Sequence, residues 1–227
     1  TLCLTEHNKK IIHQAGICPI IVSSLDTHMT SPHVMLQVAK TLREFTKNNV
    51  ESQAALGALN CCDKLIRLFD VHRKLSVVVT SLCFALTELC MTNTGNQNRC
   101  RMAGLAESLL KTMETHLSVE LFSEAVCILI AISSKDNTEN IVYFSQSGIV
   151  EVLVRLLVIN RANSTIVFSA VVTISSILKH NRPMGSKLLL QPNPDGSQGS
   201  GLVQDQLVNA GLKYGDSTSG NAPELAY

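Results

Sequence analysis

The sequence predicts an all-α protein, built as an α-solenoid of about four repeated units. Its strongest sign is a junction residue that recurs every 44 residues, between a polar periodic stretch and an apolar one. The junction residues are Gly16, Asn60, Gly104 and Gly148. A repeat period in the forties is typical of helical solenoids, in which each unit buries its apolar surface only against its neighbours. Hydrophobic residues make up 45% of the 227 residues and aromatic residues only 4%, so we expect a core of stacked aliphatic side chains.

The first helix of each unit is expected to be short and to end at the junction. Glycine and asparagine adopt positive φ at low cost, as a tight corner between two helices requires. Eight residues before each junction stands a polar residue whose side chain can accept hydrogen bonds from the free N–H groups of a helix start. These predicted N-caps are Asn8, Ser52, Asn96 and Asn140.

Two longer helices are expected after each junction. The second helix is indicated by residues 60–69 and 148–157, which align apolar with apolar and Asp63 with Glu151. The third helix is marked by apolar triplets at spacing four and three, which form one helical face. The triplets are Val38, Leu42 and Phe45; Leu82, Leu86 and Leu89; Ala125, Leu129 and Ile132; and Ala170, Ile174 and Ile177. They recur every 43 to 45 residues, which indicates a one-residue change in the loop before this helix.

Three helices in each unit give twelve in total. Their predicted ranges are 8–15, 17–27, 33–47, 52–59, 61–71, 75–91, 96–103, 105–116, 119–134, 139–147, 149–159 and 164–180. The unit of a short helix, a glycine corner and two longer antiparallel helices resembles the armadillo-repeat family. The resemblance covers residues 1–181 and is carried by the corner segments 14–16, 102–104 and 147–149, the last followed by the apolar run 152–157.

This resemblance implies a right-handed α-solenoid of about four armadillo-type three-helix repeats, plus a degenerate partial repeat at the C-terminal end. It also implies a concave groove lined by the third helix of each repeat. A HEAT-type solenoid, with two helices in each unit, is the structural alternative. The proline and lysine signature that HEAT units often carry is not found in the sequence.

The two ends of the chain depart from the repeat. Residues 1–4 read as the last turn of a preceding third helix, so we expect the 1–181 solenoid to begin inside an earlier repeat of a longer protein. Residues 182–201 have linker composition and are expected to form a flexible insertion. Residues 202–213 resemble a degenerate first helix of a fifth repeat, and residues 214–227 are expected to form a polar tail.

The cysteines and histidines show no pattern of a metal or catalytic site. The eight cysteines include no C-x-x-C pair, and we interpret them as reduced thiols in the core; a Cys61–Cys62 disulfide or a reactive thiol is the alternative. We interpret most of the seven histidines as solvated, because several fall in predicted loops or at helix ends. The sequence therefore predicts no metal, no cofactor, no catalytic residue and no enzyme activity.

Charge and hydropathy disfavour two further classes of partner. The chain has 19 basic and 18 acidic residues without a basic cluster, whereas non-specific nucleic-acid binding needs clustered Lys and Arg. The longest apolar run, residues 125–132, is far shorter than the roughly 20 residues of a membrane span. We expect a cytoplasmic protein, with a nuclear or cytoskeleton-associated location as the alternative. The oligomeric state stays open.

The expected binding site is the groove of third helices. Four repeats about 9 Å apart give a groove of roughly 35 Å, which accommodates roughly ten extended residues. In the nuclear-import branch of the family each third helix carries a Trp and, four residues later, an Asn. In this sequence those eight positions hold other residues. Along the groove, the residues change from charged in the first repeat to small or apolar in the last two repeats. The candidate contact residues are Lys40, Glu44, Lys47, Phe84, Glu88, Met91, Cys127, Ala131, Lys135, Val172, Ser176 and Lys179.

The function that follows is a non-enzymatic scaffold or adaptor that binds a protein partner, either a peptide, a helix or a folded surface. The first alternative is a regulatory module of a larger enzyme or motor assembly, such as a ubiquitin ligase, a GTPase exchange factor or a cytoskeletal complex. The second alternative is a peptide receptor of the nuclear-import type, which the missing Trp and Asn slots disfavour.

Overall fold

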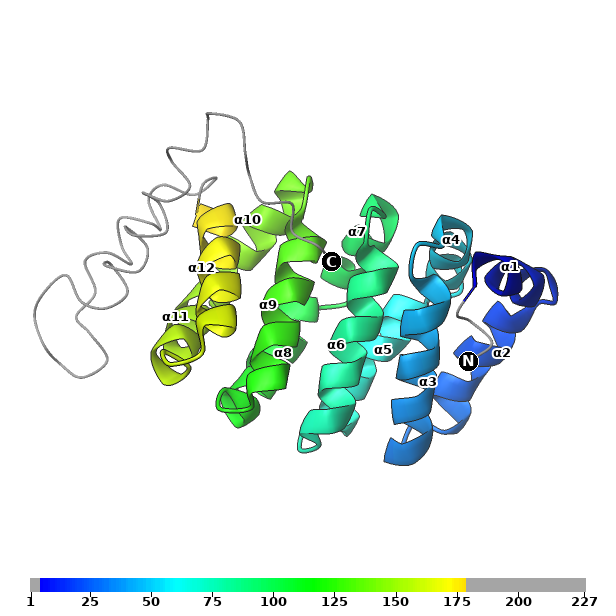
Figure 1. The fold of residues 1–227 in the computed structure, drawn as a ribbon, viewed down its shortest axis with the longest axis horizontal. Helices are drawn as coiled ribbons and strands as arrows, with labels where there is room; N and C mark the ends of the chain where they lie inside the picture. Colours follow the sequence, from blue (N-terminus) through cyan, green and yellow to red (C-terminus); the bar gives the residue numbers. More distant parts are fainter. Residues whose placement is uncertain (1–4, 179–227) are drawn as a thin grey trace, which may run out of the picture.

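The computed structural model of the protein describes residues 5–178, and this part of the chain is all-α, as predicted (Figure 1). It contains twelve helices and no strand. The helices fall into four consecutive sets of three. The first helices of the sets are α1 (Glu6–Gln14), α4 (Val50–Ala58), α7 (Thr94–Met102) and α10 (Thr138–Gln146). The second helices are α2 (Ile17–Thr27), α5 (Cys61–Val71), α8 (Leu105–His116) and α11 (Ile149–Ile159). The third helices are α3 (Pro32–Thr46), α6 (Ser76–Cys90), α9 (Glu120–Ser134) and α12 (Ser164–Leu178).

The corners between first and second helices have the predicted backbone conformation. The φ angle is 77° at Gly16, 60° at Asn60, 79° at Gly104 and 88° at Gly148. An L-residue other than asparagine or aspartate would rarely adopt these angles, so the corner restricts the residue types that each junction accepts.

The predicted N-caps of the first helices are wrong by three residues. The caps are Thr5, Asn49, Asn93 and Asn137, and each side chain accepts a hydrogen bond from the N–H three residues further on. The predicted caps provide those N–H groups and stand inside the first turn. Both positions carry residues that can cap a helix, so the residue type alone does not distinguish them.

The expected one-residue change before the third helices is also wrong. These helices begin at residues 32, 76, 120 and 164, so the spacing is 44 residues throughout. The error arose in α9, where ten of fifteen residues are buried. A helix that is apolar on most sides offers several triplets at spacing four and three, and its apolar pattern does not define the register.

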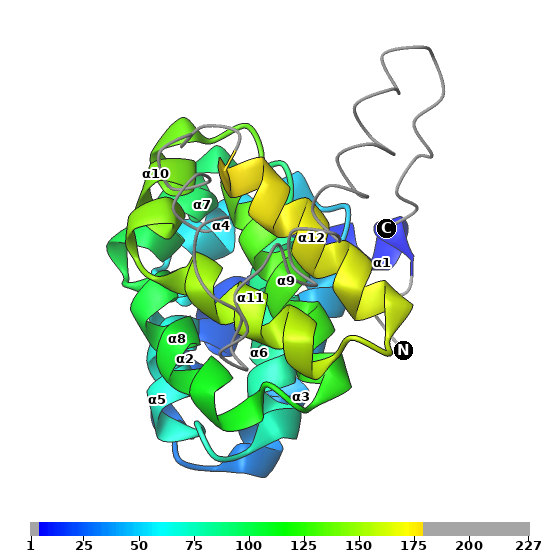
Figure 2. The same ribbon diagram turned by 90° about the vertical axis from the view of Figure 1, so that its left-hand side faces the viewer.

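The third helices lie side by side in one row, α3 against α6, α6 against α9 and α9 against α12 (Figure 1). The second helices form a parallel row behind them, and each packs against the third helix of its own set. Figure 2 looks at the two rows from the α11–α12 end. One continuous cluster of buried side chains runs through all four sets; most are aliphatic, and the others are cysteine, phenylalanine and methionine.

Buried asparagines join consecutive sets at one end of the helices. The Nδ2 of Asn96, at the start of α7, donates to the carbonyl oxygens of Gln53 (2.9 Å) and Leu89 (2.8 Å), both in the preceding set. The Nδ2 of Asn140 donates two equivalent hydrogen bonds, 3.1 and 2.7 Å long. Their acceptors are the carbonyl oxygens that lie 44 positions after Gln53 and Leu89 in the sequence. Leu89 lies in the last turn of α6, where carbonyl groups have no partner within the helix. The asparagines therefore satisfy helix ends that burial removes from water.

A second series of hydrogen bonds joins the sets where the second helices end. The Nε2 of His72 lies 2.8 Å from the carbonyl oxygen of Met29, and that of His116 lies 2.6 Å from the carbonyl of Arg73. Asn160 makes the third such bond, 2.9 Å long, to a carbonyl of the preceding set. His72 and His116 are 3% and 6% exposed, so the prediction of solvated histidines is wrong for these two. The Nε2 atoms of His72 and His116 must therefore carry the hydrogen, because a carbonyl oxygen only accepts hydrogen bonds.

No single helix among residues 5–178 combines the length and the apolar character that a membrane crossing needs. The pair α10 and α11 meets these criteria only when the two helices are taken together, and they are bent by 73° at the break between them. The predictions for residues 1–4, 182–201, 202–213 and 214–227 fall outside the described residues.

Replacing Asn140 by alanine should lower the free energy of unfolding by about 2–3 kcal/mol, because two buried carbonyl oxygens lose their donor. Asn140 is 1% exposed, so water cannot replace the amide without opening the joint between sets. Urea denaturation followed by far-ultraviolet circular dichroism measures the change. The exposed Gln146→Ala in the same helix is the control, with an expected change within about 0.5 kcal/mol. Equal stability of the two variants would show that these hydrogen bonds do not hold the sets together.

Candidate protein-binding surface

The candidate surface is the side of α3, α6, α9 and α12 that faces away from the second helices, here called the third-helix face. Ten of the predicted contact residues are at least partly exposed on these helices or at the residue that follows them. They are Lys40, Glu44, Lys47, Phe84, Glu88, Met91, Ala131, Lys135, Val172 and Ser176. Lys179 lies outside the described residues.

Cys127 is the one predicted contact residue that the structure contradicts. It is fully buried, and burial raises the pKa of its thiol to about 12. The cause is the register error in α9. With a constant spacing of 44 residues, the partner of Phe84 in this set is Ile128, which is partly exposed. Ile132, which occupies the Glu88 slot, is 6% exposed and belongs to the core.

A hollow of about 320 Å³ lies on the third-helix face between α3, α6 and α9. Lys40 and Arg43 line it on the α3 side, Phe84 on α6, and Leu121 on α9. Of these residues, the sequence predicted only Lys40 and Phe84. Arg43 and Leu121 were not predicted, because the sequence analysis compared equivalent positions of the repeats one at a time. The hollow instead forms between different positions on neighbouring helices.

Large apolar side chains surround this hollow. Val77 is 63% exposed and Leu121 is 58% exposed, and both lie in the first turn of their helices. The Arg43 guanidinium lies over the Phe84 ring, 4.5 Å from its centroid. Such a cation–π contact is favourable and holds the ring in a defined position. Grouped apolar side chains of this kind on a surface are typical of protein contact sites.

The charges of this region come from α3 and α6. The two charged residues that line the hollow, Lys40 and Arg43, are both cations. Glu88 lies close by and is half-buried, and burial raises the pKa of its carboxyl above the usual value. Lys47 and Arg43 act in the opposite direction by attracting the carboxylate. The Glu44 carboxylate adds to the effect of burial, so the Glu88 pKa stays above its usual value despite the neighbouring cations.

The other end of the third-helix face carries few charges, of which the partly exposed Glu124 on α9 is one. Between α9 and α12, the face carries Ile128, Ala131 and Val172, with Ser169 and Thr173 beside them. The predicted change of character along the face, from charged to small and apolar, therefore agrees with the exposed residues. A partner that covers the whole face would meet a polar end and an apolar end.

The thiols belong to the core. All seven described cysteines are buried and free, including Cys61 and Cys62, which agrees with reduced thiols in the core rather than a bond between neighbours. Cys90 and Cys100 lie close together, with 3.5 Å between their sulfur atoms. Within residues 5–178, no three His, Cys, Asp or Glu side chains are grouped so that they could hold a metal ion.

Comparison of the chain with protein-family models, with curated proteins and with solved structures found no match. The third-helix face itself therefore carries the argument for function.

Replacing Glu88 by glutamine should stabilise the protein at pH 7 and leave its stability nearly unchanged near pH 3.5. A carboxyl whose pKa is raised on folding favours the protonated form, so the wild type loses stability as the pH rises from the usual value of 4.5 through the raised pKa. Glutamine keeps the shape and avoids that loss. Urea denaturation at both pH values measures the difference. A variant that is less stable than the wild type at pH 7 would show that Lys47 and Arg43 outweigh burial.

Proposed function

We propose that the protein is a non-enzymatic scaffold that binds a protein partner on the third-helix face. We also propose that its four sets are repeats of the armadillo type, stacked as a right-handed solenoid with this face on the concave side. The corners with positive φ, the constant 44-residue spacing and the continuous row of third helices support this assignment. A chain of stacked units presents a long and rigid surface, which is the usual basis of binding in helical repeat proteins.

The observation that carries the proposal is the hollow between α3, α6 and α9. Three sets contribute to it, and Val77, Phe84 and Leu121 present apolar side chains around it. In stable interfaces, a few aromatic and aliphatic anchors in such positions carry most of the binding energy, with polar residues at the rim. Phe84 is the central anchor, and Lys40 and Arg43 form the polar rim on the α3 side.

A folded surface or a helix suits this face better than an extended peptide held by its backbone. Peptide binding of the nuclear-import type uses asparagine amides that both donate and accept. With the corrected register, the slots for those amides hold Glu44, Glu88, Ile132 and Ser176. A glutamate only accepts and an isoleucine does neither, so a regular series of backbone contacts along the groove would be lost.

A reducing compartment such as the cytoplasm is part of this proposal. Seven buried free thiols support it, because cysteines of secreted proteins are commonly paired. The same surface would serve a regulatory module of a larger assembly equally well, and identification of the captured partners decides between the two.

The double variant Phe84→Ala, Glu88→Arg should reduce partner capture about tenfold or more, because it removes the anchor and reverses a charge beside it. Capture is measured by affinity purification of the tagged full chain, with the partners quantified by mass spectrometry. Circular dichroism should show unchanged helix content, because both residues are partly exposed.

Met102→Ala with Arg67→Glu is the matched control for this experiment. It removes an exposed apolar side chain and reverses an exposed charge beside α5 and α7, away from the third helices. Capture by the control should equal that of the wild type. Undiminished capture by the Phe84 variant, or an equal loss in the control, would place the interface elsewhere.

A further inference from the structure

The hollow between α3, α6 and α9 is charged on one of its sides. Lys40 and Arg43 line it from α3, and no acidic side chain of residues 5–178 lines it. From α6 and α9 it is lined by Val77, Phe84 and Leu121, with small polar residues beside them. A ligand of the hollow therefore meets two cations on one side and apolar side chains on the other.

The acidic residues of these three helices stand outside the hollow. α3 carries Glu44 and α6 carries Glu88, each one turn further along its helix than a residue that lines the hollow. The charged residues of α9 are Glu120, which is exposed, and Glu124, which is partly exposed. Across the hollow, the charge therefore changes from basic on α3 to acidic on α9.

The Arg43 guanidinium is held in place while its donors stay unused. It lies over the Phe84 ring, 4.5 Å from the centroid. Its N–H groups donate to no other residue of the 5–178 segment, and neither Arg43 nor Lys40 forms an ion pair there. A guanidinium that stacks on a ring keeps its N–H groups in its own plane, where they can bind both oxygens of a carboxylate. The α3 side of the hollow is thus prepared for a carboxylate beside an apolar anchor.

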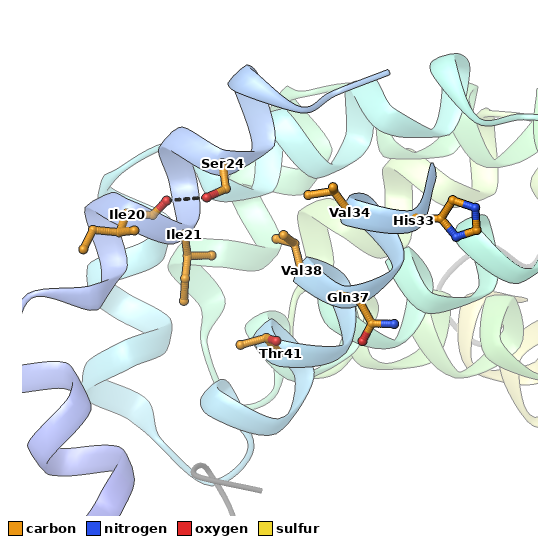
Figure 3. Close-up of a pocket in the computed structure, with 8 residues that line it drawn as sticks. All are labelled: Ile20, Ile21, Ser24, His33, Val34, Gln37, Val38 and Thr41. Carbon is orange, nitrogen blue, oxygen red and sulfur yellow. Dashed lines mark hydrogen bonds between the residues drawn. The ribbon is translucent and has the colours of Figure 1, made fainter. Parts of the chain in front are cut away.

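A second hollow, of about 370 Å³, lies between α2 and α3 (Figure 3). Ile20, Ile21, Val34 and Val38 line it, and its lining includes no Lys, Arg, Asp or Glu side chain of the described residues. Both helices belong to the first set, and the earlier repeat that the sequence predicts would lie next to them. Unlike this groove, the hollow at Phe84 can select a partner by charge as well as by shape.

We propose that the hollow at Phe84 binds an amphipathic helix of the partner, with acidic residues at the end of the helix that lies over α3. This inference rests on the proposed function and narrows it to one class of partner. A helix satisfies its own backbone hydrogen bonds, which the third-helix face does not supply. Neighbouring helices stand about 9 Å apart, so the distance from α3 to α9 is about 18 Å, which a helix of about 12 residues spans.

The charges fix the direction in which this helix crosses the face. Its carboxylates bind Arg43 and Lys40, and its apolar side chains, at spacing three and four, lie on Phe84 and Leu121. Acidic residues at the opposite end would meet the acids of α9 and be repelled.

Selection from a displayed library of helices tests the proposal. The bait is the tagged full chain, and the library consists of alanine-based helices of about four turns whose residues are randomised on one side. The wild type should enrich helices that carry Asp or Glu at one end of an apolar stripe. Phe84→Ala should lose these helices, because it removes the anchor.

Binding of the most enriched helix, measured by fluorescence anisotropy, tests the charges directly. Lys40→Glu should weaken binding about tenfold at low salt, and added salt should reduce this loss. Lys40 is exposed, so circular dichroism should show an intact fold, and the contact between Arg43 and Phe84 is kept. A helix with lysines in place of the acids should bind Lys40→Glu better than it binds the wild type.

Lys111→Glu is the matched control. It makes the same change in net charge at an exposed residue of α8, in the row of second helices. Its binding of the enriched helix should stay within about twofold of the wild type, because exposed charges at a distance are screened. An equal loss in the control would show that the overall charge of the protein, and not the hollow, attracts the acids.

Three results of the selection would overturn the proposal. Enriched helices that need Phe84 but carry no excess of acids would exclude an acidic partner and leave the proposed function standing. The absence of any enriched helix, while partner capture still depends on Phe84, would exclude a helical partner and also leave that function standing. Enriched helices that bind Phe84→Ala as well as the wild type would contradict both proposals.

Discussion

The structure depends on buried hydrogen bonds that cross from one set of helices to the next. Asparagine and histidine side chains supply the donors, and backbone carbonyls of the preceding set are the acceptors. In these four bonds, and in that of Asn160, the acceptor precedes the donor by 43 residues. An inserted residue within one of the helices between them would rotate the donor away and leave buried carbonyls without a partner, at a cost comparable to a large mutational effect. The hydrogen bonds thus favour helices of constant length in each set while most side chains change.

The third-helix face follows from this constant spacing. Because every third helix begins at the same place in its set, residues such as Lys40, Phe84 and Ile128 stand at equal heights on neighbouring helices. The core needs only the inner sides of these helices, and Ala39, Cys83 and Cys127 fill it. The outer side can then vary from cationic to apolar without loss of stability. That separation is what allows four similar sets of helices to carry a surface that changes from one set to the next.

The sequence was sufficient for the parts of the fold that local chemistry determines. Positive φ at a corner admits few residue types, so Gly16 and Asn60 could be recognised from their identity and spacing. The starts of the helices could not be recognised from residue identity, because Asn93 and Asn96 are both good caps. The choice between them depends on the buried carbonyls that Asn96 reaches. The register of α9 was lost because its apolar residues are buried on most sides, and this error replaced Ile128 by Cys127 in the candidate site. The hollow beside Phe84 was beyond sequence reasoning, because it exists only between helices from three sets.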